Sequence, residues 1–171
     1  MGISVSDRIG QLLAQHEHIK QGFDRLEKSV SDLDSVSQLK AAREKMESGK
    51  PAAGSTSLDL EKVFASIEKE LTIHFSKEED ALEESYKILQ DEGLISALSA
   101  LRADHIELLS RIKDLRAEAE GISSANLSLQ DQKDRTFLAK VHITNYRMSL
   151  ENHAEQETLM FKRLKDKLSA T

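Results

Sequence analysis

The chain has no cysteine and no tryptophan, and only one proline and seven glycines among its 171 residues. Without cysteine it can form no disulfide, no thiolate metal site, no iron–sulfur cluster and no cysteine nucleophile. The scarcity of proline and glycine argues against the many turns of a β-sandwich. Aromatic residues make up 4% of the chain and charged residues 32%. This composition is typical of helical proteins rich in Ala, Leu, Glu and Lys.

The net charge is −6 at pH 7, and no basic face of the kind that binds nucleic acid is evident, so we expect no nucleic-acid partner. No segment has the run of about 18 apolar residues that a membrane span needs. The first residues also lack the basic region and apolar run of a secretory signal. We therefore expect a soluble, cytoplasmic protein that does not engage a membrane. The sequence does not distinguish a monomer from a homodimer.

Apolar side chains recur at steps of three and four residues along four segments, which is the spacing of one helix face. The segments span about residues 4–30, 58–89, 93–120 and 130–167. Residues 50–55, which include Pro51 and Gly54, predict a loop, and Gly121 predicts the end of the third helix. Residues 31–48 fit either a short extra helix or an extension of the first. We predict an all-α fold, a single domain over residues 1–171 that forms an antiparallel up-down four-helix bundle.

Five of the six histidines fall on these apolar faces, where a helical bundle ordinarily places leucine. They are His16 on the first segment, His74 on the second, His105 on the third, and His142 and His153 on the fourth, whereas His18 points elsewhere. A buried imidazole needs a hydrogen-bond partner. One inward histidine from every helix is therefore hard to explain by packing alone.

Two of these histidines are followed four residues later by a glutamate on the same face, namely Glu78 after His74 and Glu157 after His153. Four residues is one turn along a helix and about 40° around it, so both side chains of each pair can reach the same point. An unpaired carboxylate in the core would be costly. Imidazoles and carboxylates without sulfur suit iron, and also manganese, cobalt or zinc. We predict a metal site in the bundle core, and carboxylates that can bridge favour two ions.

Simpler interpretations exist for each residue taken singly. One core histidine is more often a hydrogen-bonded packing residue, and a single HxxxE is common by chance. The joint pattern across four helices is what favours a metal site. Glu79 and Glu155 are interpreted as part of a solvated run of charges. His142 lies close to the face of His153, so it stays open as an alternative ligand or as a residue beside the ligands, and Tyr146 as part of the same cavity.

His16, HFSKEE at 74–79, DHIELL at 104–109 and NHAEQET at 152–158 together resemble the hemerythrin-like, or HHE cation-binding, domain. The resemblance covers nearly the whole chain and rests on the ordered set H…HxxxE…H…HxxxE. It implies a non-haem di-iron centre of two iron ions that an oxo or hydroxo group could bridge. The ligands that it implies are His16, His74, Glu78, His105, His153 and Glu157.

The chain departs from two branches of that family. Oxygen-carrying hemerythrins have a second histidine on the third helix and an aspartate on the fourth, where this chain has Leu109 and Thr158. The related iron–sulfur repair proteins usually carry a cysteine-containing segment, whereas this chain has no cysteine. Four histidines leave more coordination positions open than the five of the oxygen carriers.

The resemblance therefore implies a protein that binds or reacts with dioxygen, nitric oxide or peroxide, or that senses or handles iron. A catalase-like or oxidase-like enzyme at the same centre is the first alternative. The second is a structural site for zinc or another cation that stabilises the bundle as an interaction module. Manganese is a further candidate for the metal.

Overall fold

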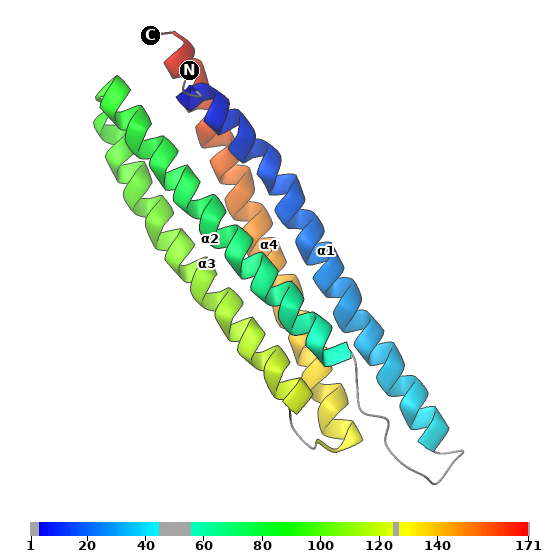
Figure 1. Ribbon diagram of the computed structural model, residues 1–171. Coiled ribbons are helices and arrows are strands. Elements are labelled where there is room, and N and C mark those ends of the chain that lie inside the picture. Colours follow the sequence, from blue (N-terminus) through cyan, green and yellow to red (C-terminus); the bar gives the residue numbers. More distant parts are fainter. Residues whose placement is uncertain (1–3, 45–55, 125–126, 171) are drawn as a thin grey trace.

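The computed structural model describes residues 4–44, 56–124 and 127–170, which form four long helices and contain no strand. The helices are α1 (Val5–Glu44), α2 (Thr56–Leu89), α3 (Glu92–Ser124) and α4 (Leu129–Ser169). Consecutive helices run in opposite directions, and the start of α1 lies at the same end of the bundle as the end of α4 (Figure 1). Each helix packs against the next in the chain, and α4 closes the circle against α1. The predicted antiparallel up-down four-helix bundle is confirmed.

The structure decides one helix boundary that the sequence left open and differs from the prediction at another. The helix α1 continues to Glu44, so the segment after Val30 extends the first helix up to that residue. The helix α3 passes through Gly121 and ends at Ser124, because a glycine inside a helix costs only about 1 kcal/mol relative to alanine. The predicted loop at residues 50–55 lies outside the described residues. No described helix combines the length and apolarity needed to cross a membrane.

A tight connection joins α2 to α3 and sets their relative height. Gln90 adopts a positive φ of 52°, and its backbone N–H donates to the carbonyl of Tyr86 at 2.8 Å, which closes the end of α2. The Asp91 carboxylate then accepts from the backbone N–H of Gly93 at 2.9 Å in the first turn of α3. With only two residues between the helices, His74 on α2 comes level with His105 on α3.

Two clusters of buried apolar side chains fill the bundle. One holds Phe23, Phe64, Ile112 and Tyr146, and the other holds Ile9, Leu82, Leu101 and Phe161. On α1, α3 and α4 the residues of the predicted metal site fall between these two clusters, and on α2 Glu78 does so while His74 adjoins Phe75 at the edge of the first cluster. A polar layer therefore lies within an apolar core, and water has little access to it except through a cavity described below.

The buried face of the first half of α4 was predicted wrongly. Leu138 is 48% exposed and the His142 side chain is 50% exposed, whereas Ala139 and Ile143 are buried. Two stripes, one through Leu138 and His142 and one through Ala139 and Ile143, both lead at helical spacing to the buried Tyr146. The periodicity alone could not choose between them.

Candidate metal centre

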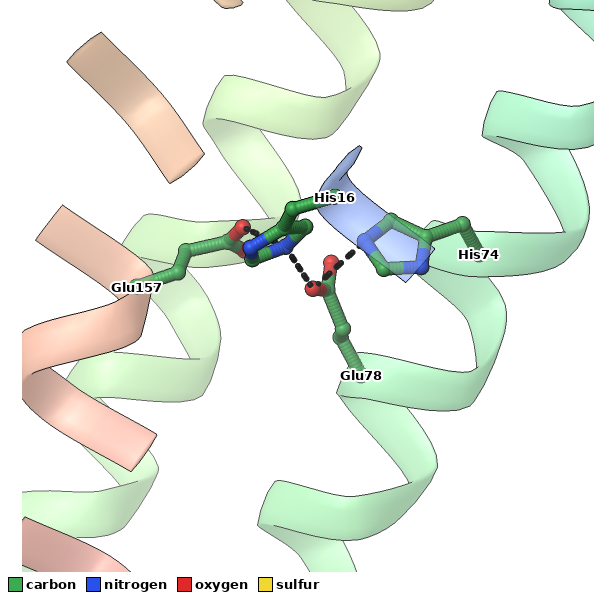
Figure 2. A group of neighbouring side chains, drawn as sticks. All are labelled: His16, His74, Glu78 and Glu157. Carbon is green, nitrogen blue, oxygen red and sulfur yellow. Dashed lines mark hydrogen bonds and ion pairs between the residues drawn. The ribbon is translucent and has the colours of Figure 1, made fainter. Parts of the chain in front are cut away.

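Six side chains meet in the polar layer, and they are the six that the sequence predicts. They are one histidine from each helix and one glutamate each from α2 and α4, namely His16, His74, Glu78, His105, His153 and Glu157. Five of them are buried, while the His16 side chain is 15% exposed. Figure 2 shows the imidazole of His16 between the carboxylates of Glu78 and Glu157, with His74 on the far side of Glu78.

The Glu78 carboxylate divides its oxygens between two pairs of histidines. Its Oε1 lies 3.1 Å from Nε2 of His16 and 2.8 Å from Nε2 of His74. Its Oε2 lies 3.5 Å from Nε2 of His105. One oxygen therefore faces α1 and α2, and the other faces α3.

The Glu157 carboxylate makes the same division from the opposite side. Its Oε2 lies 3.5 Å from Nε2 of His16, and its Oε1 lies 3.3 Å from Nε2 of His105 and 3.2 Å from Nε2 of His153. We call the surroundings of His16 and His74 position A, and those of His105 and His153 position B. Each carboxylate directs one oxygen to position A and the other to position B.

The nitrogen and oxygen atoms of these six side chains are better arranged to bind a cation than to form hydrogen bonds with one another. Nε2 of His74, Oε2 of Glu78 and Nε2 of His153 are buried without a hydrogen-bond partner. Each histidine nitrogen is close to a glutamate oxygen, but the contact lacks hydrogen-bonding alignment. A buried polar atom left unsatisfied costs about 1–3 kcal/mol. One ligand atom from each of His16, His74, Glu78 and Glu157 fits within 4.8 Å, as does one from each of His105, His153 and Glu157, so the residues fit metal ions.

Opposite charges shift the titration of this layer. Burial lowers the pKa of His16 and of His105, but the nearby carboxylates of Glu157 and Glu78 outweigh burial and raise both pKa values to about 9. Burial raises the pKa of Glu78 and Glu157, but the histidines around them outweigh it and hold both pKa values below the usual range. Without metal, imidazolium and carboxylate groups therefore pair in the core at neutral pH.

This pairing predicts how the stability of the metal-free protein depends on pH. A histidine with a raised pKa stabilises the fold below pH 6.5 and loses that contribution as the pH rises through 9. A glutamate with a lowered pKa stabilises the fold above pH 4.5 and loses that contribution on acidification. We expect the melting temperature to fall between pH 6.5 and 9.5, by about 2–4 °C for each kcal/mol lost.

Thermal unfolding followed by circular dichroism in the presence of a chelator measures this dependence. The zinc-loaded protein is the control, because its ligand histidines are already neutral and should not titrate in this range. A metal-free melting temperature that stays constant from pH 6.5 to 9.5 would contradict the pairing.

Each histidine also presents its second ring nitrogen, Nδ1, to a side chain on a neighbouring helix. Nδ1 of His74 lies 3.0 Å from Oε1 of Gln15, and Nδ1 of His105 lies 2.9 Å from Oε1 of Glu79. Nδ1 of His16 lies 3.5 Å from Oγ1 of Thr158, and Nδ1 of His153 lies 3.7 Å from Oδ2 of Asp104. Partners of this kind hold a ring so that Nε2 points at the metal.

The interpretation of Glu79 as part of a solvated charge run was wrong. Its side chain is 24% exposed and bonds to His105, with Arg102 on its other oxygen.

Sequence reasoning missed all four partners of the histidines. One signal was available, because each partner is the immediate chain neighbour of a predicted ligand on its own helix.

A family description of the hemerythrin HHE cation-binding domain matches residues 7–164. The chain belongs to the hemerythrin family. No curated protein and no solved structure matches it. Membership supports cation binding by this hemerythrin domain, and the polar layer supplies candidate ligands for it.

A cavity of about 540 Å³ reaches the polar layer of the hemerythrin domain from the side of α1 and α4. It touches His16 and His74 of position A, His153 of position B, and Glu157. Its walls include the buried apolar side chains Phe23, Leu71, Phe75 and Leu150, and its rim includes the exposed Lys20 and Glu155. Small molecules from solvent can therefore reach the layer.

His142 and Tyr146 are not part of this site, which corrects the expectation for both. His142 lies on the surface, where its Nδ1 is 2.9 Å from a carboxylate oxygen of Glu118. Tyr146 is buried in the apolar core, donates its hydroxyl to the carbonyl of Leu108 at 3.0 Å, and does not line the cavity. Because α3 continues to Ser124, His153 comes level with His105 with less overhang of α4 than the predicted boundaries required.

These placements predict that two alanine substitutions on α4 differ in their effect on metal content. His153→Ala is expected to lose metal at stoichiometric loading, because Nε2 of His153 faces the Glu157 oxygen of position B at 3.2 Å. His142→Ala is expected to keep the wild-type metal content. Metal analysis of both variants after desalting measures the difference, and a loss from His142→Ala with none from His153→Ala would contradict the site as described.

Proposed function

We propose that this hemerythrin domain binds two iron ions and uses them to bind or react with dioxygen, nitric oxide or peroxide, or to sense or handle iron. The observation that carries the proposal is the division of both carboxylates, with one oxygen of Glu78 and of Glu157 facing each pair of histidines. A single ion would leave one pair of histidines and two carboxylate oxygens buried without use. Bridging carboxylates are suited to holding two ions close together.

His16 and His74 would hold one ion, His105 and His153 the other, and Glu78 and Glu157 would bridge them. Nitrogen and oxygen donors without sulfur suit iron, and they also accept manganese or zinc. Two bound irons would supply a redox-active centre with coordination positions free for small ligands. The apolar clusters on both sides keep bulk water away, and the cavity supplies the route of entry.

A second candidate is an enzyme with catalase-like or oxidase-like activity at the same centre. The cavity of about 540 Å³ favours the oxidase-like activity in particular, because a pocket of that volume accepts reactants much larger than a diatomic gas or peroxide. Repeated turnover of peroxide distinguishes the enzyme from a protein that only binds or senses its ligand.

Anaerobic loading with Fe²⁺ tests the proposal. We expect two irons per chain, and a new near-ultraviolet absorbance when air or peroxide is admitted. The zinc-loaded protein is the matched control, because Zn²⁺ has no redox chemistry and should give no such band. Oxygen evolved over many equivalents of peroxide would favour the enzyme. One iron per chain or none, with zinc binding retained, would contradict the di-iron function and favour a structural zinc site.

A further inference from the structure

The two metal positions differ in the side chains behind their histidines. At position A both partners are neutral, since His74 faces the amide oxygen of Gln15 at 3.0 Å and His16 faces the hydroxyl of Thr158 at 3.5 Å. At position B both partners are carboxylates, since His105 faces Glu79 at 2.9 Å and His153 faces Asp104 at 3.7 Å. The ligands themselves are alike, with two histidines and one oxygen from each bridging glutamate on either side.

Of the two carboxylates, Glu79 is the better placed to act on its histidine. Its Oε2 accepts a hydrogen bond from Nε of Arg102 at 3.0 Å, which leaves Oε1 aimed at Nδ1 of His105. Asp104 is more remote, because its side chain is 60% exposed and its contact with His153 is longer than a hydrogen bond. Solvent therefore weakens the influence of Asp104 more than that of Glu79.

The chemical nature of the partner affects how strongly an imidazole binds a metal ion. When Nε2 is a ligand, Nδ1 carries the proton and donates it outward to the partner. A carboxylate acceptor makes a stronger, charge-assisted hydrogen bond than an amide or a hydroxyl does. It thereby makes the imidazole a more basic ligand, and losing such a partner typically costs about 10–100-fold in metal affinity.

We infer that the two positions are unequal, with position B binding its metal ion more tightly than position A, and that Glu79 is the positioning residue responsible. The inference rests on the proposed two-metal function. The cavity adds a second difference between the positions, because it reaches both histidines of position A but only one histidine of position B. His16 is also the most exposed of the four ligand histidines. Metal exchange and the first contact with small ligands are therefore assigned to position A.

Titration of the metal-free full chain with Zn²⁺ against a competing chelator tests whether the two positions differ in affinity. We expect two binding steps whose affinities differ by about 10–100-fold. Glu79→Gln should weaken the tighter step by about that factor and leave the weaker step unchanged. Gln15→Glu is the matched reverse substitution and should strengthen the weaker step. The two variants exchange the same amide and carboxylate groups behind equivalent histidines.

Variants that lack one ligand histidine show which position gives which Zn²⁺ binding step. His16→Ala should keep one Zn²⁺ bound with the tighter affinity, and His153→Ala should keep at most one, bound with the weaker affinity. A Glu79 that only stabilised the fold would weaken both steps together and lower the melting temperature of the metal-free protein.

Several outcomes would overturn the ranking. Two wild-type steps of equal affinity would do so, as would a Glu79→Gln variant that weakens both steps equally. A tighter ion retained in His153→Ala rather than in His16→Ala would reverse the assignment. None of these outcomes contradicts the binding of two metal ions. A single Zn²⁺ bound by the wild-type chain would contradict the two-metal function itself.

Discussion

Glu157→Gln is expected to empty both metal positions at stoichiometric loading. The two oxygens of Glu157 face different positions, with Oε2 near His16 and Oε1 near His105 and His153. An amide has only one oxygen, carries no charge and is a poor bridge between two cations. Loss of a group that merely orients a ligand costs about 10–100-fold in affinity, so loss of a bridging ligand should exceed that range. Metal analysis after desalting measures the effect.

Glu155→Gln is the matched control for this variant. Glu155 lies two residues before Glu157 on the same helix, is exposed, and stands at the rim of the cavity. It should keep two ions per chain. Circular dichroism of both variants establishes that the helices are intact. This is needed because loss of metal from an unfolded Glu157→Gln variant would say nothing about bridging. Full loading of folded Glu157→Gln would rule out bridging by Glu157.

Metal binding is expected to release protons and to tighten steeply as the pH rises. His16 and His105 have pKa values raised to about 9, so both are protonated at neutral pH in the metal-free protein, and a metal ion must displace both protons. Each displaced proton makes the affinity rise about tenfold per pH unit. Filling both positions should therefore gain about 100-fold per pH unit from these two residues between pH 6 and 8, and less above pH 9.

Calorimetric titration with Zn²⁺ in buffers of different protonation enthalpy counts these protons directly. His18→Ala is the control, since His18 is exposed on the outer side of α1 and should not change the count. His105→Ala should reduce the number of protons released. An overall affinity for Zn²⁺ that is independent of pH between 6 and 8 would contradict the charge state deduced for the layer.

Local periodicity was sufficient to predict most of the fold and to place the candidate ligands on inward faces, whereas the set of six ligands was implied by the family resemblance. The HxxxE spacing placed Glu78 and Glu157 on the faces of their histidines, and burial of both glutamates agrees with it. Periodicity failed where two stripes converge on the buried Tyr146, and it selected the one through His142. The choice between the stripe through Leu138 and His142 and the stripe through Ala139 and Ile143 requires the rotation of the helix against its neighbours.

The partners of the histidines could not be predicted for a different reason. Gln15, Glu79, Asp104 and Thr158 belong to the polar flanks of their helices, and their position beside a predicted ligand does not by itself separate them from solvated residues. Their role depends on which helix stands beside them and at what height. The exposed fraction of 24% for the Glu79 side chain is consequently a property of the bundle, not of the segment around residue 79.

The order of ligand and partner along the chain alternates from helix to helix. The partner precedes the ligand on α1 and α3, as Gln15 precedes His16, and follows it on α2 and α4, as Glu79 follows Glu78. Consecutive residues are about 100° apart around a helix, and antiparallel helices reverse the sense of that rotation. All four partners therefore point the same way round the bundle, from α1 to α2, α3, α4 and back to α1. A slip of one residue in any helix would disrupt two things together: its own inward ligand and the support of the next helix's histidine.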